Sequence, residues 1–266
     1  MLPDIDTIIA EVQQQVNLCN DNKENLKFCL SCVDLTTLEG VDNDKKVEQL
    51  CQKAKLYVPQ VASVCVYPVF VKTAKIALKD EDIHVASVAG AFPSGQSPLS
   101  VKVAEVEYVV QQGADEIDMV ISRGKFLDRQ YDEVAGEIAA IRKACKHIVL
   151  KVILETGELQ TAENIYHASM LAMQAGADFI KTSTGKCTVG ATPQAVVVML
   201  QAIKDFYSQT KKMVGLKVAG GITTTEDVLL YRQLVGNMLG EKGLQKKYFR
   251  IGTSRLADKL QAAILE

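Results

Sequence analysis

The sequence predicts an α/β protein folded as a closed (β/α)8 TIM barrel, and three observations lead to that prediction. Eight apolar runs of strand length are each followed by a stretch with helical periodicity. These runs show little alternation, as expected for parallel strands that are covered on both faces. The tripeptide Gly-Ala-Asp joins a helix to a strand twice, 63 residues apart, at 113–115 and 176–178. That spacing suits two strand–helix units of roughly thirty residues each.

The predicted elements follow one another regularly along the chain. An amphipathic helix over residues 4–19 comes first, with apolar side chains at helical spacing. Strands are predicted over residues 27–35, 61–67, 83–89, 113–122, 147–155, 177–181, 213–219 and 248–252. Helices are predicted over residues 45–56, 70–78, 101–111, 131–144, 162–174, 193–207 and 254–264, with another starting at the threonines 223–225. We expect one barrel domain over residues 1–266, of which 1–26 form an N-terminal helical extension.

An open, doubly wound sheet is the alternative for alternating strands and helices. It would need a glycine fingerprint after the first strand. The chain carries Asp34-Leu35-Thr36-Thr37-Leu38 there instead, which favours the closed barrel.

The composition excludes several classes of protein. The 266 residues carry a net charge of −2 with both signs mixed throughout, so we expect no nucleic-acid partner. The apolar runs are strand-sized, and Asp4 and Asp6 lie in the first ten residues, so neither a membrane span nor a signal peptide is expected. Seven dispersed cysteines favour the reducing cytosol, and we expect a cytoplasmic protein.

No metal site is expected either. Cys29 and Cys32 form a Cys-x-x-Cys pair, but on the predicted first strand they would face opposite sides, and no second pair completes a zinc site. The histidines His84, His147 and His167 are scattered, and we interpret each as structural or exposed.

Two predicted strands with a lysine among apolar residues are each followed by a glycine-containing turn. Lys181 precedes the hydroxyl-rich turn Thr-Ser-Thr-Gly-Lys, and Lys217 precedes Val-Ala-Gly-Gly. Burying an ammonium is costly or lowers its pKa, and two neighbouring lysines lower one another's pKa further, which makes an amine nucleophilic. The alternative for Lys181 is a strand-end lysine whose amine reaches solvent.

In a barrel, catalytic groups lie at the C-terminal ends of strands. Four successive predicted strands carry a polar candidate: Asp118, Lys151, Lys181 and Lys217. Asp118 could transfer protons, directly or through a water, or pair with a lysine structurally. Lys151 could merely balance the charge of Asp118. Asp34 and Thr36, at the end of the first strand, could bind substrate hydroxyls or cap the loop.

Glycine-containing loops that can bind an anion follow the last three strands. They contain Gly185 and Lys186, then Gly220 and Gly221, then Gly252 and Ser254. The sequence therefore predicts a phosphate pocket beside an amine. A neutral amine attacks a carbonyl to give an imine, whose protonated form accepts electrons when a carbon–carbon bond breaks or forms.

At these residues the chain resembles the deoxyribose-phosphate aldolases, class I aldolases on the (β/α)8 fold. The resembling segments span nearly the whole chain: CVDLTTL at 32–38, VCVYP at 64–68, GADEIDMV at 113–120, LKVILETGEL at 150–159, GADFIKTSTGK at 176–186, GLKVAGGI at 215–222 and FRIGTS at 249–254. The resemblance implies reversible cleavage of 2-deoxy-D-ribose 5-phosphate to acetaldehyde and D-glyceraldehyde 3-phosphate, in deoxyribonucleoside catabolism, without a metal or other cofactor.

The resemblance also implies roles for individual residues. Lys181 matches the Schiff-base lysine, Lys217 the lysine that lowers its pKa, Asp118 the proton-relay carboxylate and Lys151 a further active-site lysine. The matches to the phosphate pocket are Gly185, Lys186, Gly220, Gly221, Gly252 and Ser254. The expected partners are a small phosphorylated sugar, aldehydes and a second copy of the chain, since family members are often dimers.

The chain departs from the family pattern in two places. The family commonly has an arginine where this chain has Thr223, whereas Arg255 occupies a position where family members usually carry a small hydroxyl residue. We hypothesise that Arg255 supplies the missing charge. The chain also ends directly after a helix, so we expect no active-site tyrosine from a C-terminal tail.

Two other functions stay open at this stage. Another Schiff-base aldolase, of the transaldolase kind, would need room for a hydroxyketone beside the imine. A sugar-phosphate-binding barrel without turnover would be expected to lack one of the lysines or Asp118, and all of them are present.

Overall fold

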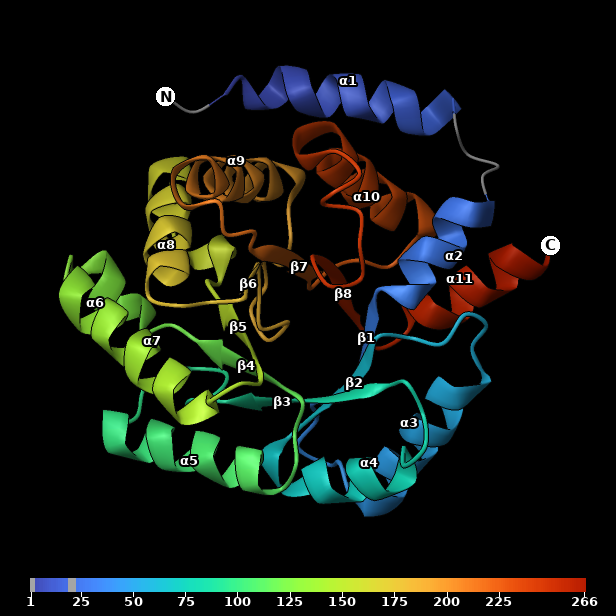
Figure 1. The fold of residues 1–266 in the computed structure, drawn as a ribbon. Coiled ribbons are helices and arrows are strands. Elements are labelled where there is room, and N and C mark those ends of the chain that lie inside the picture. Colours follow the sequence, from blue (N-terminus) through green and yellow to red (C-terminus); the bar gives the residue numbers. More distant parts are fainter. Residues whose placement is uncertain (1–2, 19–22) are drawn as a thin grey trace.

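The computed structural model describes residues 3–18 and 23–266, and they contain a closed barrel of eight parallel strands (Figure 1). The strands are arranged in sequence order around the barrel, and β8 pairs with β1 to close it. Their bounds are β1 Val33–Thr36, β2 Ser63–Val66, β3 His84–Ala89, β4 Glu116–Val120, β5 Val149–Ile153, β6 Phe179–Lys181, β7 Gly215–Ala219 and β8 Phe249–Thr253. The predicted fold class is confirmed.

Helices separate consecutive strands and cover the outside of the barrel (Figure 1). The α-helices are α1 Ile5–Leu18, α2 Lys23–Ser31, α3 Asp44–Leu56, α4 Val71–Ala77, α5 Leu99–Gln111, α6 Arg123–Leu127, α7 Tyr131–Cys145, α8 Ala162–Gln174, α9 Pro193–Thr210, α10 Thr225–Leu239 and α11 Leu256–Leu265. Two short 3-10 helices are η1 Pro68–Phe70 and η2 Thr156–Glu158. The short helices α6, η1 and η2 were not predicted, because one turn leaves no periodicity to detect.

The predicted first strand is wrong in its first half. Residues 27–31 belong to α2, and only the end of the predicted range is extended. The buried residues of α2 are Leu26, Cys29 and Leu30, whose spacing of three or four is that of a helix. The expectation that Cys29 and Cys32 face opposite sides of a strand is therefore wrong too. Cys29 lies in α2, Cys32 follows the helix, and both are buried free thiols.

Side chains alternate along the strands between two buried environments. On β4, Ile117 and Met119 belong to the apolar core between barrel and helices. Glu116 and Asp118 contact charged groups of other strands, so they point into the barrel. The two-residue period of a strand thus separates an apolar outer layer from a charged interior.

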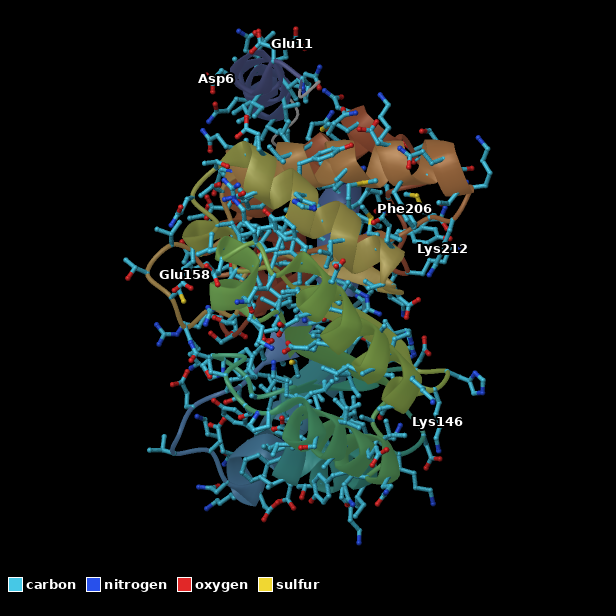
Figure 2. The ribbon with its side chains drawn as sticks, turned by 90° about the vertical axis from the view of Figure 1, so that its left-hand side faces the viewer. Asp6, Glu11, Lys146, Glu158, Phe206 and Lys212 are labelled. Carbon is cyan, nitrogen blue, oxygen red and sulfur yellow. The ribbon has the colours of Figure 1, made fainter. Side chains whose placement is uncertain are left out.

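The loops after the strands gather at one end of the barrel. In Figure 2, Glu158, which follows β5, lies on the opposite side from Lys146 and Lys212, which precede β5 and β7. In a barrel, the end at which the strands finish is the one that carries active sites.

Helix α1 lies outside the barrel, across α9 and α10 (Figure 1). Ile9, Val12 and Val16 of α1 are buried there and belong to the main core. No helix in the part of the chain that is described has both the length and the apolar character to cross a membrane.

Candidate active site

Neighbouring strands bring the predicted catalytic residues together inside the barrel. Asp118 of β4 stands opposite Lys151 of β5, and Lys181 of β6 stands opposite Lys217 of β7. The same register places Arg250 of β8 opposite Lys217. Because paired strands lie roughly 5 Å apart, ionisable side chains that point inward at matched positions must interact.

Asp118 is the acceptor that all three lysines share. Its Oδ2 atom accepts hydrogen bonds from Nζ of Lys181 and from Nζ of Lys217, each at 2.7 Å. Its Oδ1 atom accepts a hydrogen bond from Nζ of Lys151 at 2.8 Å. Asp118, Lys151 and Lys217 are fully buried, and Lys181 is almost so.

A second layer of ions lies below this cluster, toward the other end of the barrel. Asp34 Oδ2 lies 2.5 Å from Lys217 Nζ, and Glu116 forms an ion pair with Lys151. Arg250 donates to Asp34 and to Glu116 through separate nitrogens, each at 2.7 Å. Half-exposed His84 reaches Glu116 from outside, with Nδ1 2.8 Å from Oε1. Because His84 is half-exposed, water also stabilises the charge of its protonated form.

The charges of this network balance without Lys181. The other fully or nearly buried members are three acids and three bases, namely Asp34, Glu116 and Asp118 against Lys151, Lys217 and Arg250. A proton on Lys181 would leave an uncompensated positive charge in a buried site, which is costly. The arrangement therefore favours the neutral amine at Lys181.

The ionisation of the lysines follows from the same contacts. Burial and the neighbouring charge of Lys217 lower the pKa of Lys181, although Asp118 acts in the opposite direction. At Lys217 burial acts in the same way, but Asp118 and Asp34 outweigh it and raise the pKa. Burial raises the pKa of Asp118, yet the three lysines outweigh burial and hold it well below its usual range.

A cavity of about 530 Å³ opens above the cluster, and Lys181 is the one of the three lysines that lines it. Eight further predicted residues lie in its wall: Thr36, Gly185, Lys186, Gly220, Gly221, Gly252, Ser254 and Arg255. Asp118 and Lys217 lie behind Lys181 and reach the cavity through its amine. The structure thus brings together an amine, glycine loops and cationic side chains.

Glycine is required where the loops at the cavity approach one another. Gly185, Gly220 and Gly221 have φ angles of 76°, 83° and 78°, in the left-handed region. A Cβ atom at Gly190 would lie 2.4 Å from the carbonyl group of Gly220. The loop after β6 therefore packs directly on the loop after β7, and main chain forms much of the wall between them.

Comparison with known proteins identifies the family. A model described as DeoC/LacD family aldolase matches residues 28–245. The chain belongs to this aldolase family. Deoxyribose-phosphate aldolase of Homo sapiens is 45% identical over 248 residues, which cover 87% of this chain and 78% of that protein. The protein of the same name from Agrobacterium fabrum is 44% identical over 238 residues, covering 89% and 90%.

A solved structure agrees with this aldolase along nearly its whole length. Deoxyribose phosphate aldolase from Aeropyrum pernix, described as having a unique tetrameric structure, superposes with a TM-score of 0.74 at 27% identity. The match covers 96% of this chain and 97% of that one.

The structure decides two questions that the sequence left open at the site of the aldolase. Lys151 does not line the cavity, and its contacts with Asp118 and Glu116 favour the charge-balancing alternative over substrate binding. Asp34 neither lines the cavity nor caps a loop, because its carboxylate pairs with Lys217 and Arg250. The helix predicted to start at the threonines 223–225 does so, since Thr224 caps α10 in a capping box.

Sequence reasoning missed several residues of the site. Lys259 of α11 lines the cavity, and its Nζ donates to the backbone oxygen of Thr223 at 2.7 Å. Glu116 and Arg250 complete the ion network. The two-residue spacing from Glu116 to Asp118 was a signal for Glu116, and the charged position in the predicted last strand was one for Arg250. No sequence signal marked Lys259, which lies on an exposed helical face.

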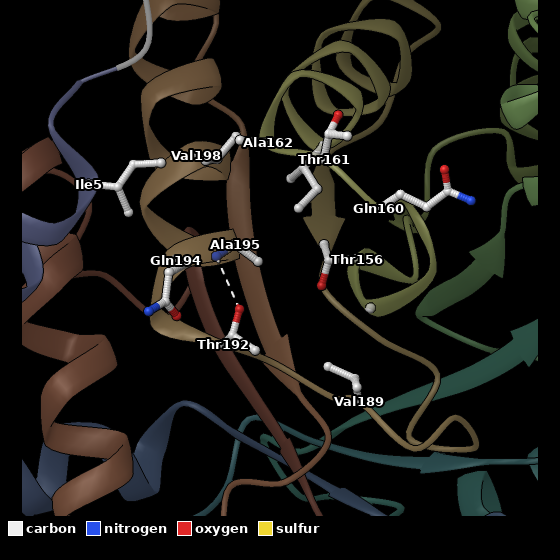
Figure 3. A pocket seen from close by; sticks show the side chains of 12 residues that line it. Ile5, Thr156, Gln160, Thr161, Ala162, Val189, Thr192, Gln194, Ala195 and Val198 are labelled. Atoms are coloured by element: carbon white, nitrogen blue, oxygen red, sulfur yellow. Dashed lines mark hydrogen bonds between the residues drawn. The ribbon is translucent and has the colours of Figure 1, made fainter.

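A second cavity, of about 200 Å³, lies outside the barrel of the aldolase between the first residues of α8 and α9, and Ile5 of α1 also lines it (Figure 3). Thr192 caps α9 there by accepting a hydrogen bond from the backbone N–H of Ala195 at 3.2 Å. Among the described residues that line it, none is charged. It therefore offers no amine that could form an imine and no cationic side chain for a phosphate.

Within residues 3–18 and 23–266, no group of three or more His, Cys, Asp or Glu side chains is arranged to hold a metal ion. That the aldolase needs no metal stays a prediction.

Proposed function

We propose that this chain is a deoxyribose-phosphate aldolase that uses Lys181 as its nucleophile. The reaction would be the reversible cleavage of 2-deoxy-D-ribose 5-phosphate to acetaldehyde and D-glyceraldehyde 3-phosphate. The observation that carries the proposal is that Lys181 opens onto the cavity while the buried charges behind it balance without its proton. The names of the relatives support the choice of substrate.

The chemistry begins with addition of the Lys181 amine to the C1 aldehyde of the open-chain sugar. Uptake of one proton and loss of water then give a protonated imine. The C3 hydroxyl then loses its proton, the C2–C3 bond breaks, and its electron pair enters the iminium to form an enamine. D-Glyceraldehyde 3-phosphate leaves at this step. Protonation of C2 and hydrolysis of the imine then release acetaldehyde and restore the amine.

Asp118 and Lys217 would serve this reaction from behind the nucleophile. Because its pKa is held low, Asp118 stays a carboxylate and stabilises the positive charge of the iminium. Protonated Lys217, whose Nζ lies 2.7 Å from Oδ2 of Asp118, raises the proportion of neutral Lys181 by charge repulsion. Asp118 can pass protons between Lys217 and the reacting atoms, directly or through a water.

The phosphate would bind at the cationic side of the cavity. Lys186, Arg255 and Lys259 reach this region from the loop after β6 and from the start of α11. The main chain of the glycine loops lies between them. Family members commonly carry an arginine at the position of Thr223. In this assignment Arg255 and Lys259 together supply the positive charge of that arginine. A role in deoxyribonucleoside catabolism, a cytosolic location and a homodimer belong to the same proposal.

The decisive experiment is reduction with borohydride in the presence of acetaldehyde, followed by peptide mapping by mass spectrometry. We expect an ethyl group on the peptide that contains Lys181. Lys181→Met should abolish both the adduct and cleavage of the sugar phosphate. Lys212→Met, which removes a half-exposed lysine outside the site, should change neither.

Each other outcome has a definite meaning. An adduct on Lys217 would keep the aldolase and reverse the roles of the two lysines. Binding of the sugar phosphate without any adduct would instead support a barrel that binds sugar phosphates but does not turn them over.

A further inference from the structure

Glu155 is a buried carboxylate at the mouth of the barrel to which the proposed mechanism gives no role. It follows β5 directly, is fully buried, and has φ 57° and ψ 61°, in the left-handed region. Glutamate rarely adopts this conformation, which costs free energy and persists only where surrounding contacts hold it. The contacts of the carboxylate should therefore explain the backbone.

The carboxylate of Glu155 holds the loop that follows β6. Both of its oxygens lie 3.2 Å from the backbone N–H of Thr184, and Oε2 also accepts a short hydrogen bond from the Thr184 hydroxyl. The same hydroxyl accepts from the backbone N–H of Lys186 at 3.1 Å. Glu155 thus fixes Thr184 and, through it, the part of the loop that carries Gly185 and Lys186.

Arg123 connects this contact to the other loops of the barrel mouth. Its NH1 lies 3.3 Å from Glu155 and 3.1 Å from Glu158, and its NH2 donates to the backbone oxygens of Pro93 and Ser94 at 3.2 Å. One guanidinium therefore joins the loops after β3, β4 and β5, and Glu155 extends the connection to the loop after β6. The Arg123 side chain is only 14% exposed, so these bonds are shielded from solvent.

The turn around Glu155 supports the far end of the same loop as well. A Cβ atom at Gly157 would lie 2.6 Å from the backbone oxygen of Val189. Val189 and Thr156 face one another across the second cavity in Figure 3. The loop after β6 is thus held at Thr184 by Glu155, at Cys187 by Arg123 and Glu158, and at Val189 by close packing on Gly157.

We propose that Glu155 is a positioning residue which, braced by Arg123, fixes the loop after β6 so that Gly185 and Lys186 meet the phosphate of the substrate. It thereby sets the preference of the enzyme for phosphorylated over unphosphorylated deoxyribose. This inference rests on the proposed function. A purely architectural role for the turn is the alternative, and it predicts equal losses on both substrates.

The test compares kcat/KM for deoxyribose 5-phosphate and for deoxyribose in Glu155→Gln. The amide keeps the size of the side chain but removes its charge and one of its acceptors. Because hydrogen bonds to a charged group are the stronger kind, we expect kcat/KM for the phosphorylated sugar to fall about tenfold or more through KM. The value for deoxyribose should change by less than about threefold. The binding of inorganic phosphate, measured by calorimetry, should weaken in parallel.

Gln160 provides a matched control for the backbone. It has φ 70°, is exposed, and lies in the same connection, five residues after Glu155. Gln160→Asn should leave the ratio of the two kcat/KM values unchanged, since asparagine suits this conformation.

Thr184→Val removes the hydroxyl from the other side of the contact and keeps the test decisive if Glu155→Gln does not fold. It should lower the ratio of kcat/KM for deoxyribose 5-phosphate to kcat/KM for deoxyribose. In the double variant this ratio should be little lower than in either single variant. Suppose that the wild type cleaves the sugar phosphate. If Thr184→Val leaves the ratio of the two kcat/KM values unchanged, or if Glu155→Gln lowers both values equally, this inference alone is overturned. A wild type without cleavage activity would overturn the proposed function and this inference with it.

Discussion

Lys181 differs from Lys151 and Lys217 in its pKa and in its exposure to the cavity, and these differences come from the surroundings of each amine. All three touch Asp118, yet Lys181 has the lowered pKa and lines the cavity, whereas the other two have raised pKa values. Asp34 and Glu116 account for much of this contrast, because they contact Lys217 and Lys151. At the scale of the residue, the lowered pKa of Lys181 follows from the absence of contacts with Asp34 and Glu116, and this contrast favours Lys181 as the proposed nucleophile.

Replacing Lys217 should test that selection. In Lys217→Met the three buried acids keep only Lys151 and Arg250, so the balance of charge favours a proton on Lys181. Each unit by which the Lys181 pKa rises reduces the neutral amine about tenfold, so imine trapping at pH 7 should slow at least about tenfold. Trapping should recover as the pH is raised, because the amine then loses its proton.

The measurement is the rate of borohydride trapping with acetaldehyde against pH. Lys212→Met serves as the control, since it removes a half-exposed lysine just before the same strand. A variant that is slow but keeps the pH profile of the wild type would contradict the role assigned to Lys217.

The cationic side of the cavity gives a second prediction at this scale. Arg255→Ala and Lys259→Ala should each raise KM for deoxyribose 5-phosphate roughly threefold to fivefold, since exposed ion pairs contribute up to about 1 kcal/mol. The kinetics with unphosphorylated deoxyribose should stay the same, and added salt should reduce the difference. Lys72→Ala, on an exposed position of α4, is the control. Equal effects on both sugars would contradict a phosphate contact.

At the scale of the element, the strand that carries Lys217 depends on how its first residue packs. A Cβ atom at Gly215 would lie 2.3 Å from Cε1 of Phe179, whose ring is buried on β6. Gly215→Ala should therefore force β7 and the ring apart and lower the free energy of unfolding by about 1–3 kcal/mol. Urea denaturation measures this change.

Gly136→Ala is the matched control for that substitution. Gly136 lies within α7, and a Cβ atom there would meet no described residue beyond its own stretch of helix within 4 Å. Alanine there should raise the free energy of unfolding by about 0.5–1 kcal/mol, because glycine loses more backbone entropy in a helix. If both glycine variants were equally stable, the close packing at Gly215 would not govern β7.

Elements also show where sequence patterns mislead. The stretch before β1 reads as apolar and short, and a strand was predicted across it, but its apolar residues have helical spacing and pack as α2. The short α6 carries Arg123 to the barrel mouth and left no periodic signal at all. Long helices such as α8 were predicted over their observed residues, because several turns reveal the period.

For the whole molecule, the buried ion network should make the free energy of unfolding fall as the pH is lowered below about 5. Burial opposes ionisation of Asp34, but Lys217 and Arg250 outweigh it and lower its pKa to about 2. A carboxyl group with a depressed folded pKa stabilises the protein above its unfolded pKa, and this contribution is lost as the pH falls through the folded value. From pH 5 to pH 3 the protonation of Asp34 alone should lower the free energy of unfolding by about 1 kcal/mol.

Urea denaturation at pH 7, 5 and 3 measures this dependence. Asp34→Asn should flatten the change from pH 5 to pH 3, whereas Glu48→Gln, at an exposed position of α3, should leave it as in the wild type. A wild type with the same stability at pH 3 and pH 7 would show that the network does not contribute in this way.

The sequence by itself determined the (β/α)8 fold, the strands that carry Asp118, Lys181 and Lys217, and most of the glycine loops. These features follow from local periodicity and from charged residues placed in apolar runs, both of which are visible along one chain. Only the tertiary structure decided that Lys181 and Lys259 line the cavity, that Lys151 and Asp34 balance charge instead of facing it, and that Glu155 holds the loop after β6. Contacts between strands, loops and helices far apart in sequence, such as Asp34 with Lys217, depend on how the barrel closes, and no local pattern records them.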